Sequence, residues 1–301
     1  MSHRSIGLWL VLGAASLWGT TGTAQALGPD GISPFSVAAV RMLGGALLVG
    51  YAFLRGEHGS LRRLPPVATV IAIAALAGSQ PLFFGGVDRT GVAIGTIATI
   101  GSGPLFAGVL TRIVRREPLG RRWAFATVLS VIGAFLIATG GEDAGVDGVG
   151  LGLALGAGLA WATYLVAAKT LFDDHPPVWV AGVLFSGAAV LLSPALFVAD
   201  VAWIATGRGV LTVVWLALIA TAFSYVGFAR GLSLTPVASA ATLTLAEPVV
   251  AAVLGMVLLD EPARLSTIAG ILLVLAGLVV LSFQGTEAAR DFRPGSGDLS
   301  P

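Results

Sequence analysis

Long apolar stretches separated by short polar breaks organise the whole chain. Each stretch holds about 20 mostly apolar residues, the length that a helix needs to cross the hydrocarbon core of a bilayer. The breaks carry turn-forming residues, as in LGPDGISP at 27–34, and none could hold a soluble domain. The pattern predicts an all-α integral membrane protein with ten transmembrane helices, at 6–26, 33–54, 67–87, 91–111, 121–139, 148–171, 177–199, 209–229, 236–259 and 265–283.

The amino-acid composition supports a membrane protein. Of the 301 residues, 56% are hydrophobic and 11% are charged, whereas soluble domains average about 25% charged residues. So few charges could not cover the surface of a water-soluble fold, so we expect the lipid bilayer to be the main solvent. The net charge of +1 predicts no nucleic-acid partner, and the absence of cysteine excludes disulfides and thiol chemistry.

The two ends of the chain need separate interpretation. Residues 1–26 could be a signal peptide, since Arg4 precedes an apolar run that ends in small residues. The internal repeat described below requires this segment as a helix, so we interpret it as the first span. The tail at 284–301 is polar and contains glycine and proline, and is predicted to be disordered.

Basic residues are distributed unevenly over the predicted loops. If the amino terminus is cytoplasmic and ten spans alternate, the outer segments hold only Arg89, Arg208 and Arg264. The inner segments then hold thirteen basic residues, namely Arg4, Arg55, Arg62, Arg63, Arg112, Arg115, Arg116, Arg121, Arg122, Lys169, Arg230, Arg290 and Arg293. Cytoplasmic loops of membrane proteins carry an excess of Lys and Arg, so both termini and the tail are expected in the cytoplasm.

The chain contains an internal repeat at an offset of 144 residues. The offset relates Pro104 to Pro248 and the Glu-Pro pair of RREPLGRR to that of LDEPARL, and it gives eight identities across 104–136. The repeat predicts two five-helix halves, 6–139 and 148–283. Because five is odd, the second half must enter the membrane from the opposite side, with RREPLGRR inside and DEPARL outside. Inverted repeats of this kind are typical of secondary transporters, with the site between the halves.

The motifs resemble those of the drug/metabolite transporter (DMT) superfamily, specifically its EamA-type members. The resemblance rests on ASLWGT at 15–20, SPFSVAAVRMLGGALL at 33–48, the segment from PLFAGVL to GAFLI at 104–137, and its partner from EPVVAAV to GLVVL at 247–281. It implies ten helices in two inverted halves and the transport of amino acids, nucleobases, sugar derivatives, cations or drugs. The seventh helix departs from the second because it has no arginine that matches Arg41.

Charged and amide side chains inside the spans are the first candidates for substrate binding, because they are costly in hydrocarbon. Glu247, followed by Pro248, could carry a proton or bind a substrate ammonium, or could be a buried carboxylate held by hydrogen bonds or by Arg41. Arg41 could bind a substrate carboxylate, pair with Glu247 or cap carbonyl groups. Gln80 precedes Pro81 and could bind an amide-like or amino-acid substrate or join two helices.

Aromatic and hydroxyl side chains form a second group of candidates. Trp18, Trp161, Tyr164 and Tyr225 lie within spans instead of at the interfaces where Trp and Tyr usually gather. As cavity walls they would favour hydrophobic, aromatic or cationic substrates, although packing alone would also explain each of them. Thr99 belongs to a hydroxyl stripe with Thr96 and Ser102, which could instead bond to its own helix.

We therefore expect a secondary carrier of the inner membrane, not an enzyme, that exports small metabolites by alternating access. Amino acids, especially aromatic or hydrophobic ones, are the first expectation, and efflux of a drug-like or cationic compound is the alternative. A protein of a different functional class, a membrane channel or sensor, is the second alternative. The chain lacks Walker A and HExxH motifs, and its histidines lie at span ends or in loops, so no cofactor and no metal are expected. A small-molecule substrate and the bilayer are the expected partners, and a monomer is the simplest assembly.

Overall fold

The computed structural model of the chain describes residues 3–32, 34–138, 147–194 and 201–282. Within these ranges all regular structure is helical and no strand occurs. The tail predicted to be disordered, 284–301, lies outside the described residues, as do 139–146 between the two predicted halves.

Twelve α-helices follow one another along the described residues. They are α1 (His3–Ala26), α2 (Pro34–Leu54), α3 (Pro66–Thr90), α4 (Val92–Leu110), α5 (Arg121–Ala138), α6 (Gly148–Phe172), α7 (Pro177–Leu192), α8 (Gly207–Val214), α9 (Ser224–Leu234), α10 (Val237–Leu243), α11 (Ala246–Leu258) and α12 (Leu265–Ser282). A π-helical turn, Thr111–Arg115, extends α4, and a longer one, Trp215–Phe223, joins α8 to α9.

Eight helical stretches of the described chain are long and apolar enough to cross a membrane. They include the combined stretches Gly207–Leu234 and Val237–Leu258, and α7 is a shorter apolar helix. Helix α1 has 24 residues, enough to span, but does not belong to the eight. The chain is therefore an all-α, multi-pass membrane protein.

The sequence explains where several of these helices begin. Pro66 and Pro177 stand in the first turns of α3 and α7, where a missing N–H costs no hydrogen bond. Asp147 caps α6, because one carboxylate oxygen accepts from the N–H groups of Val149 (2.7 Å) and Gly150 (3.1 Å). Those two bonds, that to Gly150 foremost, hold the pKa of the Asp147 carboxyl below its ordinary value.

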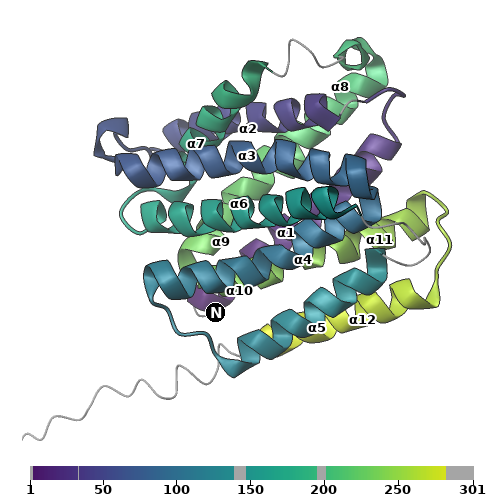
Figure 1. The fold of residues 1–301 in the computed structure, drawn as a ribbon. Helices are drawn as coiled ribbons and strands as arrows, with labels where there is room; N and C mark the ends of the chain where they lie inside the picture. Colours follow the sequence, from purple (N-terminus) through teal and green to yellow (C-terminus); the bar gives the residue numbers. More distant parts are fainter. Residues whose placement is uncertain (1–2, 33, 139–146, 195–200, 283–301) are drawn as a thin grey trace, which may run out of the picture.

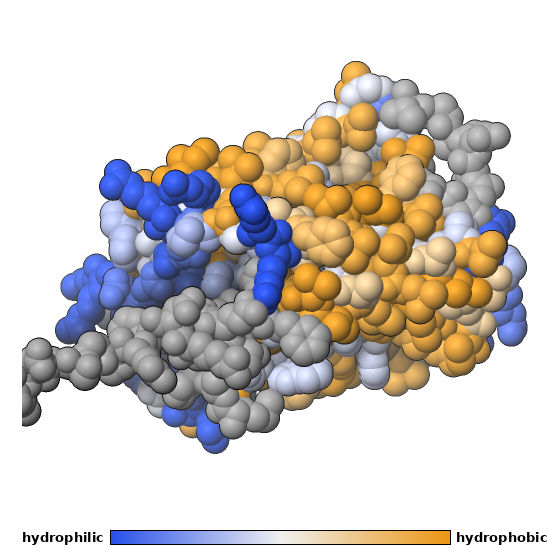
Figure 2. Space-filling view, turned by 90° about the horizontal axis from the view of Figure 1, so that it is seen from below, coloured by the Kyte–Doolittle hydropathy of each residue, from blue (hydrophilic) through white to orange (hydrophobic). Residues whose placement is uncertain are grey.

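The helices lie side by side in a bundle whose long direction is horizontal in Figure 1. Helix α3 packs on α6, α4 on α6, α2 on α7, α5 on α12, and α1 on both α9 and α11. Figure 2 shows hydrophilic residues at the two ends of the bundle and a broad hydrophobic band between them. This band is the surface that a bilayer would cover.

Ion pairs tie the turns together at each end of the bundle. At one end, Arg230 bonds Glu57 (2.8 Å), which links the α9–α10 turn to the α2–α3 turn. Arg115 bonds Asp173 (2.9 Å), which links the α4–α5 turn to the α6–α7 turn. We call this the arginine-rich end, because Arg55, Arg62, Arg63 and the five arginines between 112 and 122 belong to the same turns. At the opposite end, Arg89 pairs with Asp147 at 3.5 Å.

The contact between α5 and α12 is unusually close. A Cβ on Gly133 would lie 2.6 Å from the carbonyl oxygen of Gly270, and a Cβ on Gly270 would lie 2.5 Å from that of Gly133. Only glycine allows this approach of two backbones, which is the mode of helix association that membranes favour. Helix α5, in the first predicted half, thus packs against α12 with direct contact between the two backbones.

Candidate functional site

A central cavity of about 180 Å³ lies inside the bundle. Its walls come from α1, α2, α3, α4, α6, α7, α9, the segment that joins α10 to α11, and the first turn of α11. The polar side chains in its wall are Arg41, Ser79, Gln80, Thr99, Thr244 and Glu247, and the aromatic ones are Trp18, Phe83, Phe84, Trp161, Phe185 and Tyr225. Both predicted halves of the chain contribute to it.

The structure brings most of the candidate residues of the sequence together around this cavity. Trp18, Arg41, Gln80, Thr99, Trp161, Tyr225 and Glu247 all line it. Tyr164 does not belong to the lining, and its side chain is only 1% exposed. Its ring packs edge-on against Phe185, with centroids 6.4 Å apart, so Tyr164 supports the wall from behind.

Glu247 lies at a break in the ninth predicted span. Pro248 has no N–H to donate to the carbonyl of Thr244, which instead accepts a shorter-range bond from the N–H of Glu247 at 2.9 Å. The helix therefore stops after Leu243 and starts again at Ala246, which places Glu247 in the first turn of α11. The amino end of a helix favours negative charge, so the break suits a carboxylate.

Arg41 faces the same cavity from α2. Its Nε lies 3.5 Å from the hydroxyl of Thr221, a weak hydrogen bond at best. In the described part of the chain, no ion pair within 4.0 Å joins Arg41 to Glu247. A cation and an anion thus line one cavity without neutralising each other directly, which leaves both available to a ligand.

The aromatic side of the cavity is held rigidly. The indole N–H of Trp18 donates to the hydroxyl of Ser224 at 2.9 Å, and its ring lies 5.1 Å from that of Tyr225. Tyr225 in turn packs against Phe185, with centroids 4.3 Å apart. Aromatic pairs at these spacings add to the stability of their helices and give a ligand a fixed apolar wall.

Gln80 and Thr99 are more constrained than the sequence implies. The amide nitrogen of Gln80 lies 3.2 Å from the hydroxyl of its neighbour Ser79. The hydroxyl of Thr99 lies 3.0 Å from the carbonyl oxygens of Gly95, on its own helix, and of Ala154, on α6. Thr99 therefore joins α4 to α6, and its hydroxyl oxygen could offer a ligand its two lone pairs as acceptors.

Sequence reasoning missed several lining residues, among them Ser79, Phe83, Phe84, Phe185 and Thr244. Phenylalanines inside an apolar span carry no sign of whether they face lipid, a neighbouring helix or a cavity. One signal was available for the polar set, because Ser224, the acceptor of Trp18, lies 144 residues after Gln80. The repeat offset thus relates the cavity residue Gln80 to Ser224, which holds the cavity residue Trp18 by a hydrogen bond.

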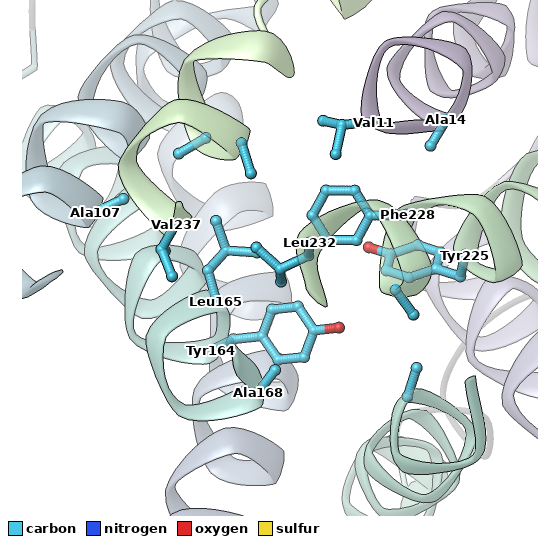
Figure 3. Close-up of a cluster of buried hydrophobic side chains, with 14 of the residues drawn as sticks. Val11, Ala14, Ala107, Tyr164, Leu165, Ala168, Tyr225, Phe228, Leu232 and Val237 are labelled. Atoms are coloured by element: carbon cyan, nitrogen blue, oxygen red, sulfur yellow. The ribbon is translucent and has the colours of Figure 1, made fainter. Parts of the chain in front are cut away.

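An apolar layer separates the cavity from the arginine-rich end. Val11, Tyr164, Leu165, Phe228, Leu232 and Val237 converge there from four helices, each at most 1% exposed (Figure 3). On α6, Tyr164 and Leu165 follow the cavity residue Trp161 toward Lys169, and on α9 Phe228 follows Tyr225 toward Arg230. Along these four helices, the side chains between the cavity and the arginine-rich end are therefore tightly packed.

A bundle of apolar helices around a central cavity with a few charged and aromatic side chains is the architecture of a membrane transport protein. The comparison with known families agrees. The chain belongs to the EamA-like transporter family, whose model matches residues 5–139 and again 148–283. This membership confirms the resemblance to the drug/metabolite transporter superfamily that the motifs suggested, and the family is one of transporters, not of enzymes.

Individual relatives are similar over nearly their whole length. An uncharacterized transporter of Bacillus subtilis (strain 168), YwfM, is 39% identical over 274 residues, 90% of this chain and 92% of the relative. The threonine/homoserine exporter RhtA of Escherichia coli (strain K12) is 28% identical over 296 residues, 95% of this chain and 94% of its own. A crystal structure at 21% identity superposes with a TM-score of 0.80 over 95% of this chain and 98% of the other, which shows a shared fold.

Proposed function

We propose that the protein is a secondary carrier that exports small metabolites, with amino acids as the first substrate class, across the inner membrane by alternating access. The observation that carries this proposal is the central cavity, in which Arg41 and Glu247 stand among aromatic side chains without an ion pair between them. A zwitterionic amino acid carries a carboxylate that suits a guanidinium and an ammonium that suits a carboxylate. The similarity to an exporter named for threonine and homoserine supports the same class.

The packing of the helices supports two five-helix halves, 6–139 and 148–283, and ten spans. To compare the halves, each span is replaced by its counterpart in the other half. The pair α3–α6 then becomes α9–α1, and the pair α4–α6 becomes α11–α1. All four of these helix pairs are in contact. The pairs α2–α7 and α5–α12 each consist of two counterparts, so the replacement leaves them unchanged. Single residues follow the same rule, because a Cβ on Gly44 would meet Ala217 in the eighth predicted span and one on Gly187 would meet Ile73 in the third.

The two Glu-Pro turns support the inverted orientation of these halves. The first turn lies against the start of α10, since Glu117 and Ala238 line one small cavity. In the second, the N–H of Glu261 donates to the carbonyl of Gly255 near the end of α11. The 17 residue steps from Ala238 to Gly255, helical except at the break between α10 and α11, correspond to about 25 Å, and the turns lie at opposite ends of the bundle in Figure 1.

The distribution of arginine supports the orientation in the membrane. The arginine-rich end would face the cytoplasm, as the positive-inside rule predicts, which places both termini of a ten-span chain on that side. The apolar layer would then close the cavity toward the cytoplasm, so the structure would correspond to a state that is closed on the inside.

Transport by purified protein in liposomes tests the proposal. Liposomes loaded with unlabelled threonine, phenylalanine or tryptophan should take up the same labelled compound by counterflow, with saturation, and should return it chemically unchanged. Saturation and counterflow distinguish a carrier from a channel, and an unchanged substrate distinguishes it from an enzyme. The absence of exchange across a panel of amino acids would contradict the substrate class, although exchange of another metabolite would still support a carrier.

The aromatic wall favours a second candidate, the efflux of a cationic drug-like compound. Six aromatic rings and one carboxylate line the cavity, and a desolvated cation is stabilised by both kinds of group. Such a substrate would not need Arg41. Transport of a quaternary ammonium dye that persists in Arg41→Gln, together with no amino-acid counterflow, would support this candidate over the first.

A further inference from the structure

A second cavity lies at the arginine-rich end, beneath the first Glu-Pro turn. It has a volume of about 100 Å³, and its wall includes Thr111, Glu117, Gly120, Trp123, Ala238 and Ser239. None of its lining residues belongs to the central cavity. It sits where the end of α4, the turn and the start of α5 meet the start of α10, and so bridges the two halves of the family match.

One wall of this cavity carries an unsatisfied hydroxyl. Thr111 is 0% exposed, and its Oγ1 has no hydrogen-bond partner among the described residues. Thr127, which is also buried, is paired with Thr242 at 2.8 Å, whereas Thr235, next to the cavity residue Pro236, is likewise buried without a partner among the described residues. Buried polar groups are almost always hydrogen-bonded, so the hydroxyl of Thr111 in the cavity wall is free to bond a ligand.

The second Glu-Pro turn has a different arrangement at the matching position. Gly255 stands where the first turn has Thr111, and the carboxylate of Glu261 packs directly against that glycine, in the space that a side chain would occupy. In the first turn the equivalent Glu117 instead turns to Arg115, with 2.7 Å between Oε1 and Nε. The space beside Gly255 is thus filled by a carboxylate in the second turn, whereas the first turn has a hydroxyl and a cavity at the matching position.

Three arginines are neighbours in sequence of cavity residues, although none of them lines the cavity itself. Arg112 follows Thr111 in the chain, Arg116 precedes Glu117 and Arg121 follows Gly120, and all three arginines are exposed. The one carboxylate in the wall is already paired with Arg115. Helix α5, of 18 residues, opens onto the same turn with its amino end, which also favours an anion. The site therefore suits a phosphate group.

The neighbouring surface places this anion site at the level of lipid headgroups. Ile113 is 67% exposed and Phe125 is 61% exposed, on either side of the turn. Exposed apolar side chains beside exposed arginines mark the boundary between acyl chains and headgroups, where clusters of basic residues attract anionic lipids. We propose that the cavity binds the phosphate of an anionic phospholipid, with Thr111 as the buried donor and Arg112, Arg116 and Arg121 around the rim.

Lipid bound there would hold the two halves together at this end. The indole N–H of Trp123, at the start of α5, already donates to the carbonyl of Ala238 on α10 at 3.0 Å. A phosphate in the adjoining cavity would contact both helices at once. Anionic lipid should therefore raise the melting temperature of the carrier, independently of which substrate it transports.

Native mass spectrometry of the full-length protein tests the proposal. Purified protein is given equal amounts of phosphatidylglycerol and phosphatidylcholine, and retained lipid and melting temperature are measured. Wild-type protein should retain about one phosphatidylglycerol per chain and melt higher with it, since the cavity has room for one headgroup phosphate. Thr111→Val, of similar size, and the double variant Arg112→Gln/Arg121→Gln should each lose at least three-quarters of this retention.

The matched control neutralises two arginines elsewhere at the same end. Arg62→Gln/Arg63→Gln removes equal charge from the α2–α3 turn and should leave phosphatidylglycerol retention unchanged. Equal losses in both double variants, or equal retention in Thr111→Val and wild type, would overturn the proposal in favour of bulk charge attraction. Displacement of the lipid by millimolar inorganic phosphate, with the same rise in melting temperature, would overturn the lipid as ligand in favour of a free anion.

Discussion

At the scale of single residues, the clearest sign of the repeat is a backbone angle. Arg116 and Asp260 are the non-glycine residues with positive φ in the described chain, both at 55°. They lie 144 residues apart, each directly before a Glu-Pro pair. Left-handed backbone costs a residue with a Cβ about 1 kcal/mol or more, and aspartate tolerates it better than arginine, so the arginine turn does not owe this geometry to its side chain. The shape of the turn has been kept while its charge changed.

This geometry predicts a stabilising substitution. Asp260→Gly should raise the free energy of unfolding by about 0.5–1 kcal/mol, because glycine adopts positive φ without a steric penalty. Unfolding in mixed detergent micelles, followed by circular dichroism, measures the change. The matched control is Asp174→Gly, an exposed aspartate of the α6–α7 turn without positive φ, which should be neutral or destabilising. Equal effects of the two substitutions would contradict the argument.

Glu247 carries the most specific functional prediction at this scale. If the carboxylate couples transport to protons, Glu247→Gln should abolish uphill transport but retain counterflow, because glutamine keeps the shape of the side chain and loses the exchangeable charge. Proton-driven uptake and counterflow, measured in the same liposomes, separate the two activities. Gln80→Glu serves as the control for charge placed elsewhere in the cavity wall. Uphill transport by Glu247→Gln at the wild-type rate would remove the coupling role.

Composition and position in the spans were enough to predict most polar residues of the cavity, but not every role. Lys169 has no recognisable motif around it, yet its Nζ donates to the carbonyls of Leu232 (2.9 Å) and Ser233 (2.6 Å) at the end of α9. This bond caps the helix. Its acceptors lie more than 60 residues further along the chain, so only the tertiary structure could reveal it.

At the scale of elements, proline had different effects in different helices. Pro81 and Pro104 lie inside α3 and α4, which continue through them, whereas Pro248 accompanies the break between α10 and α11. A proline inside a helix removes one hydrogen bond and can kink or break the helix. Whether a helix breaks there depends on what replaces the lost hydrogen bond, and next to Pro248 the N–H of Glu247 supplies a tighter turn.

The apolar layer predicts how access to the cavity is controlled. Phe228→Ala and Leu165→Ala should let water reach the cavity from the arginine-rich end, because each removes a large side chain that is at most 1% exposed. The chain has no cysteine, so a single Thr244→Cys in the cavity can report access to membrane-impermeant thiol reagents from either side. Labelling from the arginine-rich side should rise about tenfold in either variant.

The control for this experiment is a leucine that faces outward. Leu218→Ala removes a side chain that is 46% exposed on the eighth predicted span, and it should leave the labelling of Cys-substituted position 244 unchanged. If Leu218→Ala raised labelling as much as Phe228→Ala, general loosening of the bundle would explain the result and the layer would not act as a gate.

At the scale of the whole molecule, the sequence predicted the class of fold because hydrophobic length and arginine placement are set by the bilayer itself. It also predicted a site between the halves and several of its residues, among them Trp18 and Glu247, but not which helices pack together to form its walls. The helix pairs that form the walls, such as α1 with α9, follow from packing of small residues that occur throughout this glycine-rich chain. Composition does not distinguish these contacts from others.

The inverted arrangement predicts the exposure of the two Glu-Pro turns in the membrane. Gly120→Cys and Ala263→Cys are both at exposed positions, and the cysteine-free chain provides the background. In oriented vesicles an impermeant maleimide should label position 120 only from the cytoplasmic side and position 263 only from the opposite side. Labelling of both positions from one side would contradict the inverted halves and the carrier proposed from them.

The backbone contact between Gly133 and Gly270 has a consequence for biosynthesis. Helix α5 is complete at Ala138, but its partner α12 ends at Ser282, roughly 140 residues later. At about 5–20 residues per second, the ribosome needs roughly 7–28 s to supply it. During this interval the backbone of α5 at Gly133 lacks its partner, so a nascent chain that stalls before Leu265 should be less stable in the membrane than the complete chain.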